Sequence, residues 1–330
     1  MGSVLLSAPA DKPFSWGPHL YRALKDVRPD AAFFDFRSCE DPNAELLAAV
    51  EQTQPLVHIA WKGEAFLPET FRELSARGVF TLLWHPDETN PQWLPPLAKA
   101  CDLFVTQYKG MTDVYRAAGI ERIAWLLDGF TPSFFECGEV TPMEHRQYDC
   151  EVVTVGTIDR IPEYRKRMYA LNRLIREGLD VKWWGRRMSF WRNPWRDWFS
   201  GARKAYGGAM VWNDTFTKAC QCAKIFLALT RRPGVSGGLS NRAFWVTGVG
   251  AFTLMLHKEG IEEFFEPGKE VAVFHDEDEM VEMARYYLEH DDERLAIARA
   301  GQERCLRDYT NQRLLDDFLK DLPQHGGPQV

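Results

Sequence analysis

Short apolar runs alternate with amphipathic stretches along the whole chain. In the first half the apolar runs cover residues 4–8, 31–36, 56–61, 79–84, 102–107 and 122–127, and helical patterns separate several of them. Alternation of strand-length and helix-length patterns predicts a parallel sheet with helices on both faces. The first half of the chain is therefore expected to be a doubly wound α/β domain.

The same pattern begins again after a polar, turn-rich stretch at residues 141–149. Its strands are expected at residues 150–156, 180–185, 224–229, 251–256 and 270–275. We therefore predict an N-terminal Rossmann-like domain (1–140) and a C-terminal one (141–305), facing each other across a cleft. Residues 306–330 should form a helix that returns toward the N-terminal domain, followed by a tail. Ligands of such folds bind at the carboxyl ends of the strands, here in the crevice between the domains.

Composition narrows the functional classes. The 330 residues exceed the size at which a single core usually divides, about 250–300 residues. The net charge of −7 excludes an overall basic field that would collect nucleic acid. Seven scattered cysteines without metal-site spacing indicate a reducing compartment, and neither a signal peptide nor a membrane-length apolar run is evident. We expect a cytoplasmic protein without a membrane span.

A glycine-rich turn precedes the helical pattern that follows the run at 224–229. It contains Gly237, Gly238 and Ser240, and Asn241 and Arg242 then open the helix. A helix N-terminus exposes unpaired N–H groups and a partial positive charge, which suits an anion. The turn is a candidate phosphate site, and its alternative is a glycine loop whose arginine pairs with a surface carboxylate.

A second glycine turn ends the run at 150–156. Gly156 and Thr157 are followed by Arg160, Arg165 and Lys166. Basic runs of this kind are commonly solvated helix faces. Two glycine-bearing strand ends in one domain, both followed by basic residues, nevertheless favour a diphosphate bound between them.

Two other segments could indicate a different chemistry, a serine hydrolase or a metal site. GVSGG fits the nucleophile elbow of serine hydrolases with Ser236 as nucleophile, but residues 230–233 separate it from the strand. The acids at 276–278 could hold a divalent cation, yet apolar residues at helical spacing follow them, which is typical of helix-capping acids. We expect capping there, and no metal site.

The C-terminal half resembles a known family. SNRAFWVTGVGAFTLM (240–255) and the segment 260–313, with its EPGKE loop, YYL helix and final YTNQR, are similar to glycosyltransferases of the spore-maturation type. The resemblance implies the GT-B fold and transfer of a sugar from a nucleotide diphosphate sugar, a UDP-sugar above all, without a bound metal ion. The nucleotide-sugar is then a substrate, and no cofactor is expected.

The resemblance also implies places for the donor. Its diphosphate would lie between the backbone of 238–241 with Arg242 and the opposite Gly156 and Arg165. The base would lie near the loop at 210–213, which includes Val211 and Asn213, close to Gly185. Many relatives hold the ribose with a glutamate where this chain has Trp245, whose indole can only donate a hydrogen bond. Ribose recognition must therefore come from elsewhere.

The acceptor side is expected at the strand ends of the first half. An inverting transfer needs a general base, for which Asp87 is the first candidate and His85 the second. The alternative is that Asp87 and Glu88 cap a helix, and a retaining mechanism also stays open. Trp16, Gly17 and His19 follow the first strand and would form another wall of the acceptor cleft.

Tryptophan and arginine alternate at residues 182–204, which include Trp191, Arg192 and Arg196. The stretch could be a Trp-rich helical hairpin packed on the core. Such basic aromatic stretches also bind flipped or single-stranded nucleic acid through stacking and phosphate contacts. The first hypothesis for the acceptor is therefore a hydroxymethylated base in DNA. A surface polysaccharide, a glycoprotein, or a non-catalytic sugar-nucleotide-binding module are the alternatives.

Overall fold

The chain forms two compact α/β units. The computed structural model describes residues 3–158, 162–186, 200–229 and 235–330. Unit 1 comprises Met1–Thr131, Val235–Leu239 and Asp308–Val330, and unit 2 comprises Pro132–Gly234 and Ser240–Arg307. Val235–Leu239 therefore belongs to unit 1, although the residues on both sides of it in the sequence belong to unit 2.

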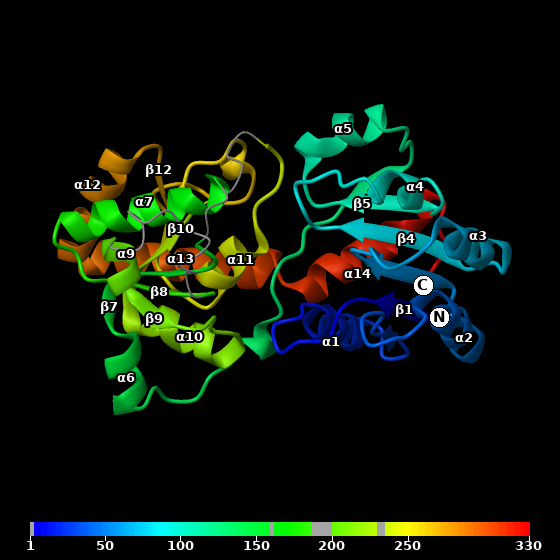
Figure 1. The fold of residues 1–330 in the computed structure, drawn as a ribbon, viewed down its shortest axis with the longest axis horizontal. Coiled ribbons are helices and arrows are strands. Elements are labelled where there is room, and N and C mark those ends of the chain that lie inside the picture. The colour runs from blue at the N-terminus through cyan, green and yellow to red at the C-terminus, as the bar shows by residue number, and fades with distance from the viewer. Residues whose placement is uncertain (1–2, 159–161, 187–199, 230–234) are drawn as a thin grey trace. The chain divides into compact units, whose positions relative to one another are not determined.

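Unit 1 is built on a parallel sheet of six strands, of which Figure 1 labels β1, β4 and β5. In spatial order they are β2 (Ala32–Phe34), β1 (Val4–Ser7), β3 (Val57–Trp61), β4 (Phe80–His85), β5 (Leu103–Thr106) and β6 (Ile123–Trp125). The chain passes to one side of β1 to reach β2 and to the other side to reach β3. The topological switch point, where doubly wound sheets bind ligands, is therefore between β1 and β3.

Helices of unit 1 are positioned by local caps and by their apolar faces. They are α1 (Gly17–Val27), α2 (Pro42–Thr53), α3 (Pro68–Ala76), α4 (Leu94–Ala98), α5 (Thr112–Ala117) and α14 (Asn311–Asp321), with short 3₁₀ turns η1 (Lys109–Met111) and η5 (Leu322–His325). Asp41 is the N-cap residue of α2. Its carboxylate accepts hydrogen bonds from the N–H groups of Asn43 and Ala44, and Pro42 is the first residue of the helix. The C-terminal helix α14 packs against α1 within unit 1.

Unit 2 contains the second parallel sheet. Its spatial order is β12 (Ala272–Phe274), β11 (Thr253–Leu256), β10 (Ala223–Ala228), β7 (Cys150–Val155), β8 (Val181–Trp184) and β9 (Tyr206–Gly208). If β7 to β12 are numbered 1 to 6, the spatial order is 6-5-4-1-2-3, which is the Rossmann order 3-2-1-4-5-6 read from its other end. The topological switch point of this sheet lies between β7 and β10. Gly156 follows β7 directly, and the turn before Arg242 follows β10.

The helices of unit 2 are α6 (Pro142–Tyr148), α7 (Pro162–Arg176), α9 (Gly201–Lys204), α10 (Asn213–Cys222), α11 (Asn241–Gly248), α12 (Glu277–Glu289) and α13 (Asp291–Asp308), with 3₁₀ turns η2 (Pro132–Phe134) and η4 (Ile261–Glu263). A buried apolar cluster, including Leu171, Leu174 and Trp183, joins α7 to the sheet. Asp276 accepts hydrogen bonds from the N–H groups of Asp278 and Glu279, so the predicted capping is confirmed.

The α/β class predicted from the alternation is confirmed, and two local expectations need correction. The stretch 141–149 contains helix α6 (Pro142–Tyr148) instead of turns, because Thr141 and Glu144 make a reciprocal capping box and Pro142 opens the helix. The short strand β9 was not predicted, since its Tyr-Gly-Gly sequence lacks an apolar run. None of the helices in the described parts of the chain is long and apolar enough to cross a membrane.

Candidate donor site at the switch point of unit 2

Glycine backbones of adjacent strand ends lie in direct contact at the carboxyl edge of the second sheet. The N–H of Gly156 donates to the carbonyl of Trp184 (2.8 Å), and the N–H of Gly185 donates to that of Gly208 (3.1 Å). A Cβ at Gly185 would overlap the Gly156 carbonyl oxygen, so position 185 needs glycine. The backbones of Gly156, Gly185 and Gly208 thus form a glycine ledge at the strand ends, in which Gly156 and Gly185 are buried.

Two arginines converge on this ledge. A Cβ added at Gly156 would lie 2.7 Å from Nη1 of Arg167 and 3.0 Å from Nη1 of Arg242. Arg167 donates from Nη1 to the carbonyl of Thr157 (3.0 Å) and is only 8% exposed. Gly156 has φ +153°, which further favours glycine there. The switch point of unit 2 therefore carries two guanidinium groups directly beside Gly156.

The N-terminus of α11 belongs to the same edge. Ser240 is its N-cap residue but makes no side-chain capping hydrogen bond, and no acidic residue lies in the first turn. Arg242 is in that first turn. The partial positive charge of the helix end and the two guanidinium groups together suit a diphosphate.

Arg167 was not among the donor-site residues predicted from the sequence. The prediction named its neighbours Arg165 and Lys166, and the structure places the exposed Lys166 away from the core, whereas Arg167 is buried. Helical spacing contained the signal, because Arg167, Leu171 and Leu174 share the i, i+4, i+7 stripe that faces the core. An arginine on such a stripe needs a polar partner, which here is the backbone beside Gly156. Arg160 lies outside the described residues.

The glycines of the turn before α11 have a packing reason that the sequence did not show. The N–H groups of Lys109 and Gly110 donate to the carbonyls of Gly237 (3.0 Å) and Ser236 (3.1 Å). A Cβ at Gly238 would lie 2.5 Å from the Gln107 carbonyl oxygen, and Gly237 has φ +63°. Gly237 and Gly238 thus permit close backbone contact within unit 1.

The expected nucleotide-base region follows β9. Val211 is buried, and Asn213 begins α10 with φ +48°. Trp245, where relatives of the resembled family carry a glutamate, lies with its ring centroid 5.8 Å from that of Phe135 and 6.3 Å from that of Phe216. The half-buried indole packs in an aromatic cluster, so this position supplies hydrophobic contact.

The predicted acceptor-side residues lie in unit 1 and separate into two groups. Trp16 and His19 are buried, their rings stack at 4.0 Å, and the Trp16 indole donates to Asp128 (2.6 Å). A Cβ at Gly17 would collide with the Pro9 carbonyl, so this glycine lets α1 approach the end of β1. These three residues pack the interior of unit 1 and leave little surface for a substrate.

Asp87 and His85 follow β4 and differ in exposure. The Asp87 side chain is 41% exposed and its carboxylate lies 3.2 Å from Nζ of Lys62. His85 is 2% exposed, its Nε2 lies 3.0 Å from the Thr89 carbonyl, and burial lowers its pKa to about 4. Neither Asp87 nor Glu88 caps a helix, since the next one, α4, has Trp93 as its N-cap residue. That alternative is therefore wrong.

Three other predictions concerned a serine nucleophile, a metal site and the tryptophan- and arginine-rich stretch. Helix α11 begins at Asn241, five residues beyond Ser236, so the nucleophile-elbow geometry is not formed. In the described part of the chain no group of three or more His, Cys, Asp or Glu side chains could hold a metal ion. Trp191, Arg192 and Arg196 lie outside the described residues.

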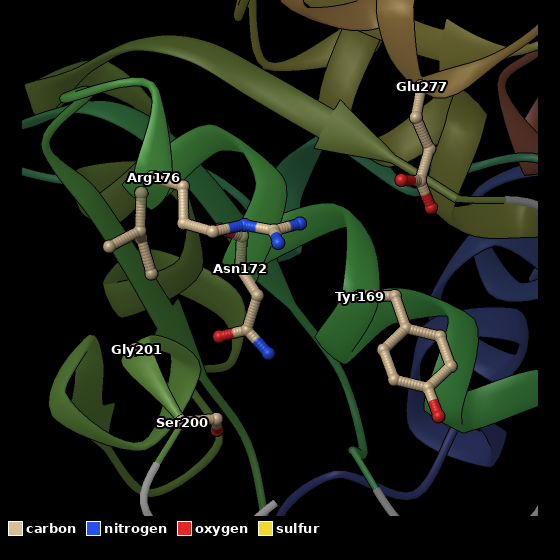
Figure 2. Close-up of a pocket in the computed structure, with 7 residues that line it drawn as sticks. Tyr169, Asn172, Arg176, Ser200, Gly201 and Glu277 are labelled. Atoms are coloured by element: carbon tan, nitrogen blue, oxygen red, sulfur yellow. The ribbon is translucent and has the colours of Figure 1, made fainter.

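A cavity of about 550 Å³ lies elsewhere in unit 2 (Figure 2). Asn172, on α7, fixes α9 beside it by accepting a hydrogen bond from the Ala202 N–H (2.7 Å). The cavity is formed by helices α7, α9 and α12, not by strand ends, and is distinct from the glycine ledge. Its lining residues are Tyr169, Asn172, Ile175, Arg176, Ser200, Gly201 and Glu277.

Comparison with known proteins places this geometry in a fold class. Residues 165–320 match a family model described as glycosyl transferase-like. HepE of Anabaena, solved with UDP and glucose, has 11% identity and a TM-score of 0.67, over 98% of this chain and 100% of HepE. Sucrose-phosphate synthase of Thermosynechococcus elongatus has 10% identity and a TM-score of 0.66, with 98% and 99% coverage. The fold is GT-B.

The GT-B fold also occurs in a protein described as a UDP-N-acetylglucosamine 2-epimerase from Listeria monocytogenes. It has 11% identity and a TM-score of 0.59, with 98% and 96% coverage. No curated protein sequence matches the chain. At such identities the solved structures establish the fold, and the family-model match adds support for glycosyltransferase activity. The spore-maturation type within GT-B glycosyltransferases is not confirmed.

Proposed function

We propose that the protein transfers a glycosyl group from a UDP-sugar to an acceptor hydroxyl. The observation that carries this proposal is the convergence of Arg167 and Arg242 on Gly156 at the switch point of unit 2. Neighbours of the same fold, including HepE, have been solved with UDP or UDP-glucose bound. The two cations beside Gly156 suit the negative charge of a diphosphate.

The two guanidinium groups also support transfer without a bound metal ion. As the sugar leaves, negative charge develops on the diphosphate, and preorganised cations stabilise that charge. Arg167 and Arg242, with the N-terminus of α11, supply positive charge at this place. On the acceptor side we assign Asp87 as general base, because its carboxylate is exposed whereas His85 is buried.

The donor assignment is tested by thermal unfolding with UDP, GDP, ADP and their sugars. A ligand at 100 times its dissociation constant stabilises a protein by about 2.7 kcal/mol. We expect UDP and a UDP-sugar to raise the melting temperature more than the other nucleotides do. Stabilisation by none of them would refute the donor site, and binding without release of UDP would favour a non-catalytic binding module.

For the acceptor we propose a hydroxymethylated base in DNA. The support is the alternation of tryptophan and arginine at Trp191, Arg192, Trp195, Arg196 and Trp198 in the sequence, which suits stacking and phosphate contact. Trp183 and Trp184 of the same stretch are buried in unit 2 and do not contribute to this argument. A glycan acceptor is favoured by a different observation in unit 1. There Lys12, Arg37 and Lys62 each lie beside a carboxylate, of Asp11, Glu64 and Asp87 respectively, so this edge offers no uncompensated cation cluster among its described residues.

Salt dependence separates the two acceptors. Each phosphate neutralised on duplex DNA contributes about 0.9 to the slope of log affinity against log salt. We expect a hydroxymethylcytosine oligonucleotide to bind with a steep slope that falls when Arg192 and Arg196 are changed to alanine. Undetectable binding at low salt, or indifference to both arginines, would replace the DNA acceptor with a glycan.

A further inference from the structure

Lys62 occupies an unusual backbone conformation at the carboxyl edge of the first sheet. It follows β3, at the switch point between β1 and β3, and has φ +72°. Only two other non-glycine residues in the described ranges have positive φ: Gln54, which is the C-cap of α2, and Asn213. Asparagine tolerates a positive φ, and a left-handed residue is common at the C-cap of a helix. Neither explanation applies to Lys62, because it is a lysine and lies between a strand and Gly63.

The side chain of Lys62 is directed by two contacts. Its Nζ lies 3.2 Å from the Asp87 carboxylate and 5.1 Å from the centroid of the Trp61 ring. Its N–H donates to the Trp84 carbonyl (2.8 Å), which joins the ends of β3 and β4. Backbone and side chain together hold the ammonium group against Asp87.

Folding stability does not explain a lysine here. The Lys62 and Asp87 side chains are 29% and 41% exposed, and ion pairs this exposed contribute little. Glycine would adopt the same φ without strain. Strained non-glycine residues gather at functional sites, where the surrounding structure maintains them. We propose that Lys62 is the positioning residue for the Asp87 carboxylate during glycosyl transfer.

The step that Lys62 would assist rests on the proposed function. The acceptor O–H gives its proton to the Asp87 carboxylate while its oxygen forms a bond to the anomeric carbon. The bond from that carbon to the β-phosphate oxygen breaks, and UDP leaves with the electron pair. Lys62 keeps the carboxylate in one rotamer facing the acceptor and exchanges no proton itself.

The test compares Lys62→Gly, Lys62→Arg and Asp87→Asn by UDP release, with water as acceptor. The donor used is whichever of UDP-glucose, UDP-galactose and UDP-N-acetylglucosamine the wild type turns over fastest. We expect Lys62→Gly to unfold at the same or a higher temperature, because it relieves the strain, and to lower kcat at least tenfold. Its KM for the donor and its Kd for UDP should stay within twofold, and Lys62→Arg should stay within threefold in kcat.

The double variant Lys62→Gly/Asp87→Asn decides whether the lysine acts through the carboxylate. We expect it to be no slower than Asp87→Asn alone, because both changes then remove one function. A Lys62→Gly variant with full kcat, or losses that multiply in the double variant, would overturn the positioning role. Wild-type protein that binds UDP but releases none from any donor would overturn the proposed function itself, and the positioning role with it.

Discussion

Replacing Arg167 by methionine should weaken UDP binding without removing the fold. The change deletes the guanidinium group beside Gly156 and keeps an unbranched apolar stem in a position that is 8% exposed. A hydrogen bond to a charged group contributes about 1.5–3 kcal/mol. Since about 1.4 kcal/mol corresponds to tenfold in affinity, the Kd for UDP should rise roughly 10- to 140-fold. The measurement is calorimetric titration with UDP at one ionic strength.

The matched control for this prediction is the adjacent residue. Lys166→Met removes the same charge from the same helix, but Lys166 is exposed. We expect its Kd for UDP to remain within twofold of wild type, with both variants folded by circular dichroism. Equal affinities of Arg167→Met and Lys166→Met would show that the Arg167 guanidinium does not contact the diphosphate, and the donor site would have to be moved.

Gly156→Ala should weaken UDP binding at least tenfold in calorimetry, because its Cβ would lie 2.7 Å and 3.0 Å from the two guanidinium groups; unchanged affinity would refute their convergence. Gly110→Ala should lower the melting temperature, because its Cβ would lie 2.9 Å from the Ser236 nitrogen, whereas Gly138→Ala, with open space around it, should not. His58 is fully buried and burial lowers its pKa to about 3, so the unfolded chain binds a proton that the folded chain excludes, and stability falls as pH drops from about 6.5 toward 3. Urea denaturation should show this loss at up to about 1.4 kcal/mol per pH unit, and His58→Gln should narrow its gap to wild type between pH 7 and pH 5; a constant gap would contradict the assignment.

Much of the fold could be predicted from the sequence, because apolar periodicity reports which residues face a core. The strand-length runs at 4–8 and 150–156 became β1 and β7 with boundaries shifted by one residue. Features that depend on one or two residues, such as a helix cap, predicted structure less clearly than the apolar periodicity did. The Thr141–Glu144 capping box was present in the sequence, but the polar composition of 141–149 concealed a helix.

The sequence by itself also placed Gly156 directly after a strand and Arg242 at the start of a helix, and from these positions it predicted an anion site. Only the tertiary structure decided that Arg167, eleven residues after Gly156, returns to cover it, since this requires the direction of α7 across the sheet. The same holds for Gly237 and Gly238. Their neighbours Gln107 and Lys109 lie far away in the sequence, and a close backbone contact between distant segments leaves no periodic trace in either one. Periodicity reports burial along one element, whereas a binding site depends on where several elements end.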